Sequence, residues 1–239
     1  MTAVRLAGER ESPHRAGDFQ GISMTISPVD FASMLCSRLC HDLLSPVGAL
    51  NNGLELLADE TDPAMRQRCM ELLSDSARTS ANKLKFFRLA FGAAGAFGET
   101  VDPREARAAI EGLLSDAKRT TLGWLVDADA LPKAAVKALL NLTLIANEAL
   151  VRGGTLDIGA EEEDGRLEIV VRIAGPRIIL DTELRRMLTE GTAADGITSR
   201  LAAAFMVHTL VAEGGGHVLV SDQGEGVMVF GATMAASAG

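Results

Sequence analysis

The sequence contains no tyrosine, one tryptophan and three cysteines, so its core must be built mainly from aliphatic side chains. An odd number of cysteines does not favour a disulfide framework, and this indicates a reducing compartment. The apolar run Leu201–Val207 is far shorter than the ~20 residues that a membrane-spanning helix needs. A signal-peptide pattern is also missing. We therefore expect a cytoplasmic protein with no membrane partner.

Excess positive charge is lacking as well, because the formal net charge is −9 at pH 7. Binding to nucleic-acid phosphates requires a basic surface, so we expect no nucleic-acid partner. A chain of 239 residues can form one large or two small domains. Residues 1–23 mix Arg, Glu, Ser, Pro and Gly without periodicity, which predicts a disordered leader and leaves Met24 as an alternative start.

Two long helices are predicted after this leader. Ser27 followed by Pro28 is a helix start, and the first helix should run from Pro28 to Ala58. Asp62-Pro63 repeats that signal, and the second helix should end near Phe91. The two helices form a hairpin domain over residues 24–97. Because one hairpin cannot bury its apolar faces, we expect a homodimer in which two hairpins form a four-helix bundle.

One histidine occupies the polar side of the first helix. At about 3.6 residues per turn, His41 lies almost opposite Leu39, Leu43 and Leu50, so it should point outward. Its neighbours on that side are mostly small or polar and leave room for a partner. They are Met34, Ser37, Ser45, Gly48 and Asn52. The apolar stripe of the same helix consists of Ala32, Cys36, Leu39, Leu43, Val47, Leu50, Leu54 and Leu57.

A metal site is not expected at this histidine. Cys36 and Cys40 are one turn apart, but His41 points away from Cys36 and no other Cys/His cluster supplies ligands. We interpret the thiols as buried, small apolar side chains.

The residues that follow the histidine carry a family resemblance. The run His41-Asp42-Leu43-Leu44-Ser45-Pro46 resembles the H-box of two-component histidine kinases and histidine phosphotransferases. The wider context, Leu35–Leu57, is similar to phosphotransferases of the bacterial cell cycle. The resemblance implies that His41 is phosphorylated and that Asp42 and Ser45 tune its chemistry. We expect the surrounding surface to dock a receiver domain through Met34, Ser37, Arg38, Leu44, Gly48 and Asn52.

Basic residues on the second helix should lie level with His41 if the hairpin turns near residue 60. They are Arg78, Lys83, Lys85 and Arg88. They form either an ordinary solvated face or a source of positive charge that speeds encounter with an acidic partner.

The second half, residues 98–239, alternates helices and strands and predicts an α/β sandwich. We expect helices at Pro103–Ala117, Leu131–Val151, Asp181–Thr189 and Ser199–Ala212, and strands at Thr121–Val126, Thr155–Ala160, Leu167–Ile173, His217–Ser221 and Val227–Met234. The whole chain is therefore of the α+β class. This half resembles the ATP-binding domain of histidine kinases.

The positions that hold nucleotide in those kinases do not match. Ile145 stands where the second asparagine is expected, Ile173 replaces the adenine-binding aspartate, and Arg177 replaces a glycine. Only Gly196 remains of the glycine-rich lid, and glycine is what lets backbone N–H groups approach phosphates. We expect a degenerate domain with no cofactor of its own, neither ATP nor metal.

The expected function is that of a histidine phosphotransferase in a two-component phosphorelay, which shuttles a phosphoryl group between receiver aspartates through His41. The resemblance implies a CckA-like hybrid kinase receiver as donor and CtrA-like and CpdR-like response regulators as acceptors, with Mg²⁺ supplied by the receiver. Two alternatives stay open: an ATP-dependent histidine kinase with a divergent nucleotide site, and a non-catalytic dimeric scaffold.

Overall fold

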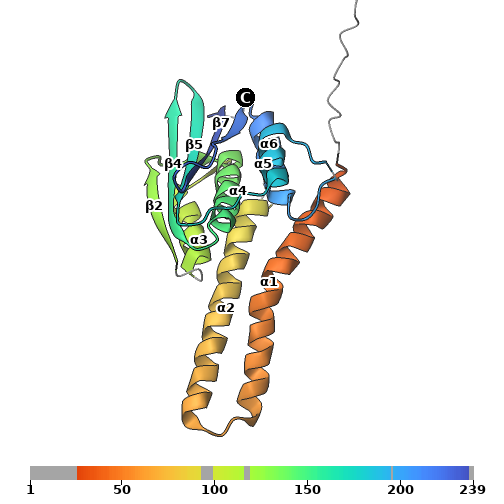
Figure 1. Cartoon of the computed structure of the whole chain (residues 1–239), viewed down its shortest axis with the longest axis vertical. Helices are drawn as coiled ribbons and strands as arrows, with labels where there is room; N and C mark the ends of the chain where they lie inside the picture. Colours follow the sequence, from red (N-terminus) through yellow and green to blue (C-terminus); the bar gives the residue numbers. More distant parts are fainter. Residues whose placement is uncertain (1–25, 93–98, 116–118, 195, 237–239) are drawn as a thin grey trace, which may run out of the picture.

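The computed structural model describes residues 26–92, 99–115, 119–194 and 196–236. In it a long helical hairpin carries an α/β layer against one end (Figure 1). The predicted leader and Met24 lie outside the described residues. Among the helices that the structure describes, none is both long and apolar enough to cross a membrane.

The hairpin consists of α1 (Pro28–Asp59) and α2 (Pro63–Phe91), which confirms both predicted helices to within one residue. The side chain of Ser27 accepts a hydrogen bond from the backbone N–H of Asp30 at 3.1 Å, and Asp62 caps α2 in the same way. Proline follows each cap, where its missing N–H costs nothing. The two caps therefore determine where each helix begins.

The helices approach each other closely at Gly53. A Cβ atom at this position would lie 3.0 Å from the Leu73 side chain, so glycine is what permits the contact. Only part of the predicted apolar stripe faces α2, however. Cys36, Val47 and Leu54 remain exposed in the single chain. α1 thus keeps a second, open apolar face.

The interpretation of the cysteines is partly wrong. Cys69 on α2 is buried as predicted, but Cys36 and Cys40 are exposed in the single chain because both lie on this open face of α1.

The second half contains a five-stranded sheet in the order β2-β4-β5-β7-β6, in which β2 pairs with β4 in parallel and all other pairs are antiparallel. The elements are β1 (Thr100–Val101), α3 (Pro103–Leu114), β2 (Thr120–Val126), β3 (Leu131–Pro132), α4 (Lys133–Ala149), β4 (Gly154–Glu163), β5 (Arg166–Ala174), α5 (Thr182–Glu190), α6 (Ala202–Glu213), β6 (His217–Val220) and β7 (Val227–Ala235). The predicted α+β architecture is confirmed.

Several bounds differ from the prediction. β4 continues to Glu163, through residues predicted as a turn, and α3 ends at Leu114. Two helix starts also differ. Leu131 and Pro132 do not open a helix but form β3, which pairs with β1, and α4 begins only at Lys133. The helix predicted from Ser199 begins at Ala202, because the preceding residues form a turn.

Helices cover one face of the sheet, as Figure 1 shows. Alternate residues of β5, such as Ile169 and Val171, are fully buried beneath α4 and its neighbours, whereas Val170 faces solvent on the other side. This is the pattern of a strand with one buried face.

The hairpin is joined to this domain through a shared core. Phe86, Phe87 and Ala90 at the end of α2 are buried in the same cluster as α3, α4 and the sheet. On α1, the Phe31 ring packs edge-on against Phe205 of α6, with centroids 5.1 Å apart. The domain therefore lies against the half of the hairpin that carries His41.

Candidate phosphotransfer site

The imidazole of His41 projects from the middle of α1 into solvent. Its side chain is 84 % exposed, which agrees with the outward direction predicted from the helical period. The site lies on the surface, and its chemistry depends on which protein groups hydrogen-bond to the imidazole.

Asp42 holds the ring. His41 Nδ1 lies 3.1 Å from Asp42 Oδ1. A carboxylate can only accept a hydrogen bond, so Nδ1 must be the protonated nitrogen in this contact. In the neutral ring, Nε2 then keeps its lone pair and faces away from the protein. Nε2 is therefore the ring nitrogen that is left without a partner in this arrangement and that an approaching group could reach.

Pro46 changes the backbone beneath the site. In an α-helix the N–H of residue 46 would donate to the carbonyl of residue 42, but proline has no N–H. The ammonium of Lys83 on α2 donates to this Asp42 carbonyl at 2.9 Å. Lys83, which the sequence predicted to be either a solvated residue or a source of functional charge, therefore supplies the hydrogen bond that the Asp42 carbonyl cannot receive from Pro46.

Arg38 connects the site to the second domain. Its Nε donates to Asp42 Oδ2 at 2.8 Å, and a terminal nitrogen of the same guanidinium forms an ion pair with Glu148 near the end of α4. Sequence reasoning missed Glu148. It lies 110 residues from Arg38, and no local pattern distinguishes it from other helical glutamates.

The predicted docking residues are not equally accessible. Leu44, Ser45, Ser37 and Asn52 are exposed, and Met34 and Gly48 are half-buried, all on the side of α1 that carries His41. Arg38 differs, because its side chain is only 10 % exposed and is held by two carboxylates. Its role in docking stays a prediction, and its position is inside the site rather than on the surface.

A shallow groove continues the His41 side of α1 toward its N-terminus. One wall comes from α1, including Asp30, Met34 and Ser37. The other wall is the segment Ile197–Ser199, which precedes α6. Ser37 is one helical turn from His41, so this segment of the second domain borders the surface around the histidine.

Two of the positions compared with kinase nucleotide sites, Ile145 and Ile173, make packing contacts, whereas Arg177 is exposed. Ile145 and Ile173 are buried in the core. The buried amide of Asn141 donates to the carbonyls of Ala90 and Lys137, which ties α4 to the end of α2.

Burial, and secondarily the nearby Lys133, lower the pKa of the Lys137 ammonium. Within the described part of the chain, no cluster of three His, Cys, Asp or Glu side chains could hold a metal ion.

Known proteins are similar to this chain in sequence and in fold. The family model "Histidine phosphotransferase C-terminal domain" matches residues 103–226. "Protein phosphotransferase ChpT" of Brucella abortus (strain 2308) is 41% identical over 155 residues, which is 64% of this chain and 72% of that protein.

A solved structure described as a "1.7 Angstrom Structure of a Bacterial Phosphotransferase" superposes with a TM-score of 0.78 at 32% identity, covering 88% of this chain and 98% of the other. The Acinetobacter baumannii histidine kinase AdeS superposes more loosely, with a TM-score of 0.45 at 14% identity over 83% of this chain and 98% of the other. The family model, the Brucella relative and the first of these structures together show that the chain belongs to the histidine phosphotransferase family.

Proposed function

We propose that His41 is the phosphoryl carrier of this phosphotransferase and that it moves the group between aspartates of receiver domains. The observation that supports this most is the orientation of the ring. Asp42 accepts from Nδ1 at 3.1 Å, and Nε2 is left open on an exposed surface.

The transfer step follows from this geometry. The Nε2 lone pair attacks the phosphorus of a receiver aspartyl phosphate, a P–N bond forms, and the P–O bond to the aspartate breaks. The aspartate leaves as a carboxylate with the bonding electrons. The ring keeps its Nδ1 proton, and Asp42 stabilises the positive charge that develops on it. Onward transfer to a second receiver reverses these bonds. Ser45, one turn on, is exposed on the same side and within the surface that a phosphoryl group would approach.

In this proposal the chain contributes no residues that bind a divalent metal or a nucleotide. Mg²⁺ belongs to the receiver, which carries the acidic site for it. The apolar and buried Ile145 and Ile173 support a domain without ATP chemistry. The donor would be the receiver of a CckA-like hybrid kinase, and the acceptors CtrA-like and CpdR-like response regulators.

The working form in this proposal is a homodimer. Its support is the open apolar face of α1, where Val29, Val47 and Leu54 are 74 %, 51 % and 56 % exposed. A second hairpin would cover this face and complete a four-helix bundle, while His41 would stay accessible on the other side of the helix.

Receiver docking would use α1 and the second domain together. Met34 and Leu44 supply apolar contact on either side of His41, and Leu44 is 70 % exposed. The rest of this surface is formed by small or polar residues, namely Ser37, Gly48 and Asn52. The segment Ile197–Ser199 is the second patch, because it shares a groove with Met34 and Ser37.

The test is phosphotransfer from a panel of phosphorylated receiver domains. Wild-type protein should acquire acid-labile phosphate, and His41→Gln should acquire none while keeping its circular dichroism spectrum and oligomeric state. His217→Gln is the matched control, because His217 is an exposed histidine on β6, far along the chain from the site. Acid-labile phosphate on His41→Gln would contradict the assignment.

Two further arms separate the alternatives. Incubation with labelled ATP alone should label nothing, whereas a histidine kinase would label itself. A non-catalytic scaffold would bind receivers equally well with or without His41 and would show no transfer at any receiver concentration.

A further inference from the structure

Arg38 lies between two carboxylates from different domains. Its Nε donates to Asp42 Oδ2 at 2.8 Å within α1, and its terminal nitrogen pairs with Glu148 of α4. The Arg38 and Asp42 side chains are only 10 % and 17 % exposed, and Glu148 is 41 % exposed. The guanidinium is therefore largely removed from water and depends on these partners.

The charges of the four side chains joined by these contacts balance. Arg38 and Lys83 contribute two positive charges, and Asp42 and Glu148 contribute two negative charges. A buried charge is tolerated only when it is paired and hydrogen-bonded, so Glu148 compensates part of the desolvation of Arg38. Without it, the guanidinium would keep one partner and gain freedom to rotate.

The orientation of Asp42 depends on this arginine. One carboxylate oxygen of Asp42 accepts from Arg38 and the other accepts from His41 Nδ1. The planar guanidinium donates along defined directions, so it sets the plane of the carboxylate. That plane in turn sets the orientation and tautomer of the imidazole.

The backbone that carries Glu148 belongs to a helix packed into the core, although the carboxylate itself is partly exposed. Glu148 lies near the end of α4, whose neighbouring residues Ala146 and Ala149 are buried in the shared core. Contacts from a packed element position a functional group better than contacts from solvent-exposed side chains.

We propose that Glu148 is a positioning residue for phosphotransfer. Acting through Arg38, it orients Asp42 and keeps His41 in the tautomer with an open Nε2. The second domain would then contribute to the transfer step itself and not only to docking. This inference rests on the proposed role of His41, and it assigns Arg38 to the interior of the site.

The two roles for Arg38 differ in their kinetics. A docking residue changes the receiver concentration that gives half-maximal rate. A positioning residue changes the rate at saturating receiver, because a small misplacement of a reacting group slows the chemical step.

The experiment compares Glu148→Gln with wild type in two measurements. We expect the transfer rate at saturating phosphorylated receiver to fall about tenfold with a nearly unchanged half-saturating concentration, since misplacement by about 1 Å can cost up to about a hundredfold. We also expect side-chain ¹⁵N spectra of unphosphorylated protein, with the His41 signal assigned from His41→Gln, to show Nδ1–H in wild type and a shift toward Nε2–H in the variant.

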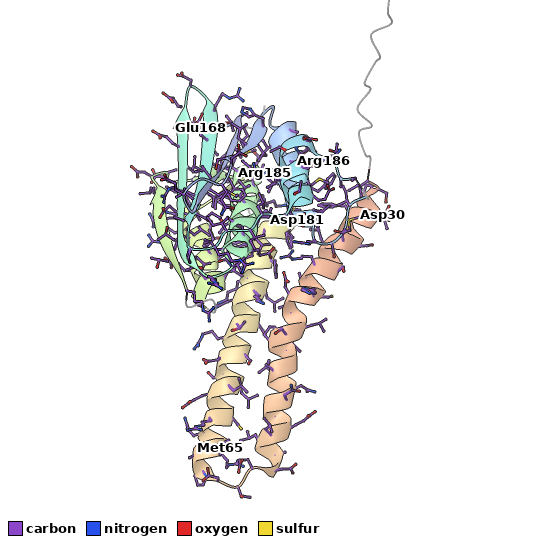
Figure 2. All side chains as sticks on the ribbon, in the orientation of Figure 1. Asp30, Met65, Glu168, Asp181, Arg185 and Arg186 are labelled. Atoms are coloured by element: carbon purple, nitrogen blue, oxygen red, sulfur yellow. The ribbon has the colours of Figure 1, made fainter. Side chains whose placement is uncertain are left out.

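Three further variants make the test decisive. Arg38→Lys keeps the charge but cannot bridge two carboxylates with one planar group, so it should show the same two changes. Glu148→Asp keeps the negative charge and should recover most of the tautomer preference. Glu168→Gln is the control, because Glu168 is an exposed glutamate on β5 that Figure 2 places well away from the hairpin.

The proposal is overturned if Glu148→Gln leaves both the saturating rate and the tautomer unchanged. It is also overturned if only the half-saturating receiver concentration rises, because that result would assign Glu148 and Arg38 to docking. If wild type fails to accept phosphate at His41, the proposed function fails instead, and the tautomer measurement still decides whether Glu148 positions the ring.

Discussion

At the scale of single residues, a proline in α1 leaves one backbone carbonyl without its helical hydrogen-bond donor, and a side chain of α2 donates to that carbonyl instead. Pro46 cannot donate to the carbonyl of Asp42, and Lys83 donates to it at 2.9 Å. The interaction joins α2 to the residue that holds the imidazole. It therefore fixes the register of the two helices at the level of His41.

This pairing predicts a coupling between Lys83 and Pro46. Lys83→Met should lower the free energy of unfolding by about 1–2 kcal/mol, because it leaves a part-buried carbonyl without a donor. In a Pro46→Ala background the loss should be much smaller, since the alanine N–H can donate to the same carbonyl. Urea denaturation of the four proteins measures the coupling, with Lys85→Met as an exposed control. Equal losses in both backgrounds would show that Lys83 acts independently of the carbonyl.

The residues at the positions that resemble a kinase nucleotide site predict no binding of ATP. Ile145 and Ile173 are buried and apolar, so they can neither ligate Mg²⁺ nor accept a hydrogen bond from adenine. Calorimetric titration with ATP and Mg²⁺ should give no binding heat. Micromolar affinity would favour the histidine-kinase alternative.

At the scale of elements, α1 has three differently used sides. One contacts α2 at Gly53, one carries His41, and one presents exposed apolar side chains such as Val47 and Leu54. Leu43 and Leu50, which sequence reasoning placed in the same stripe, are half-buried in the single chain. Substituting them would damage the hairpin as well as any interface, so the exposed side gives the cleaner test.

We therefore predict that Leu54→Asp converts a dimer into a folded monomer. Leu54 is 56 % exposed in the single chain, so the charge would be costly only if a second hairpin buries it. Leu56→Asp is the matched control, because Leu56 is 61 % exposed on a different side of the same helix. Light scattering after size exclusion gives the mass of each variant. A dimeric Leu54→Asp protein would place the interface elsewhere.

The elements that sequence could predict are those with local signals. Ser27-Pro28 and Asp62-Pro63 mark both helix starts, and the helical period alone placed His41 outward. Contacts between distant segments had no such signal. The β1–β3 pair joins two segments of two residues each, too short for any periodicity, and the Arg38–Glu148 ion pair crosses 110 residues. Arg38 was consequently interpreted as a surface residue although it lies inside the site.

At the scale of the whole molecule, the hairpin and the second domain cannot be separated without loss. Phe86 and Phe87 of α2 are buried in the core that the second domain shares. A truncation near residue 96 would expose both rings, so slower transfer by the isolated hairpin would not distinguish a missing docking surface from a damaged helix. The docking role of the second domain has to be tested in the full chain.

The segment Ile197–Ser199 offers that test. Thr198 is exposed on the wall of the groove that faces Met34 and Ser37, and its substitution by arginine would fill the groove without touching the core. If a receiver spans α1 and this segment, Thr198→Arg should raise the half-saturating receiver concentration by roughly threefold to tenfold, which corresponds to about 0.7–1.4 kcal/mol of lost binding. The rate at saturating receiver should stay close to that of wild type, because the Glu148–Arg38–Asp42 contacts are unaffected.

Thr121→Arg provides the matched control, since Thr121 is an exposed threonine on β2, at the edge of the sheet opposite β6. It adds the same side chain and charge, so any general attraction between the added arginine and an acidic receiver affects both variants alike. The kinetic signature expected for Thr198→Arg is the reverse of that expected for Glu148→Gln, in which the saturating rate falls at constant half-saturation. If Thr198→Arg and Thr121→Arg transfer with the same half-saturating concentration, receivers do not contact this segment. Docking would then rest on α1 alone, and the contribution of the second domain would be confined to the ion pair that holds Arg38.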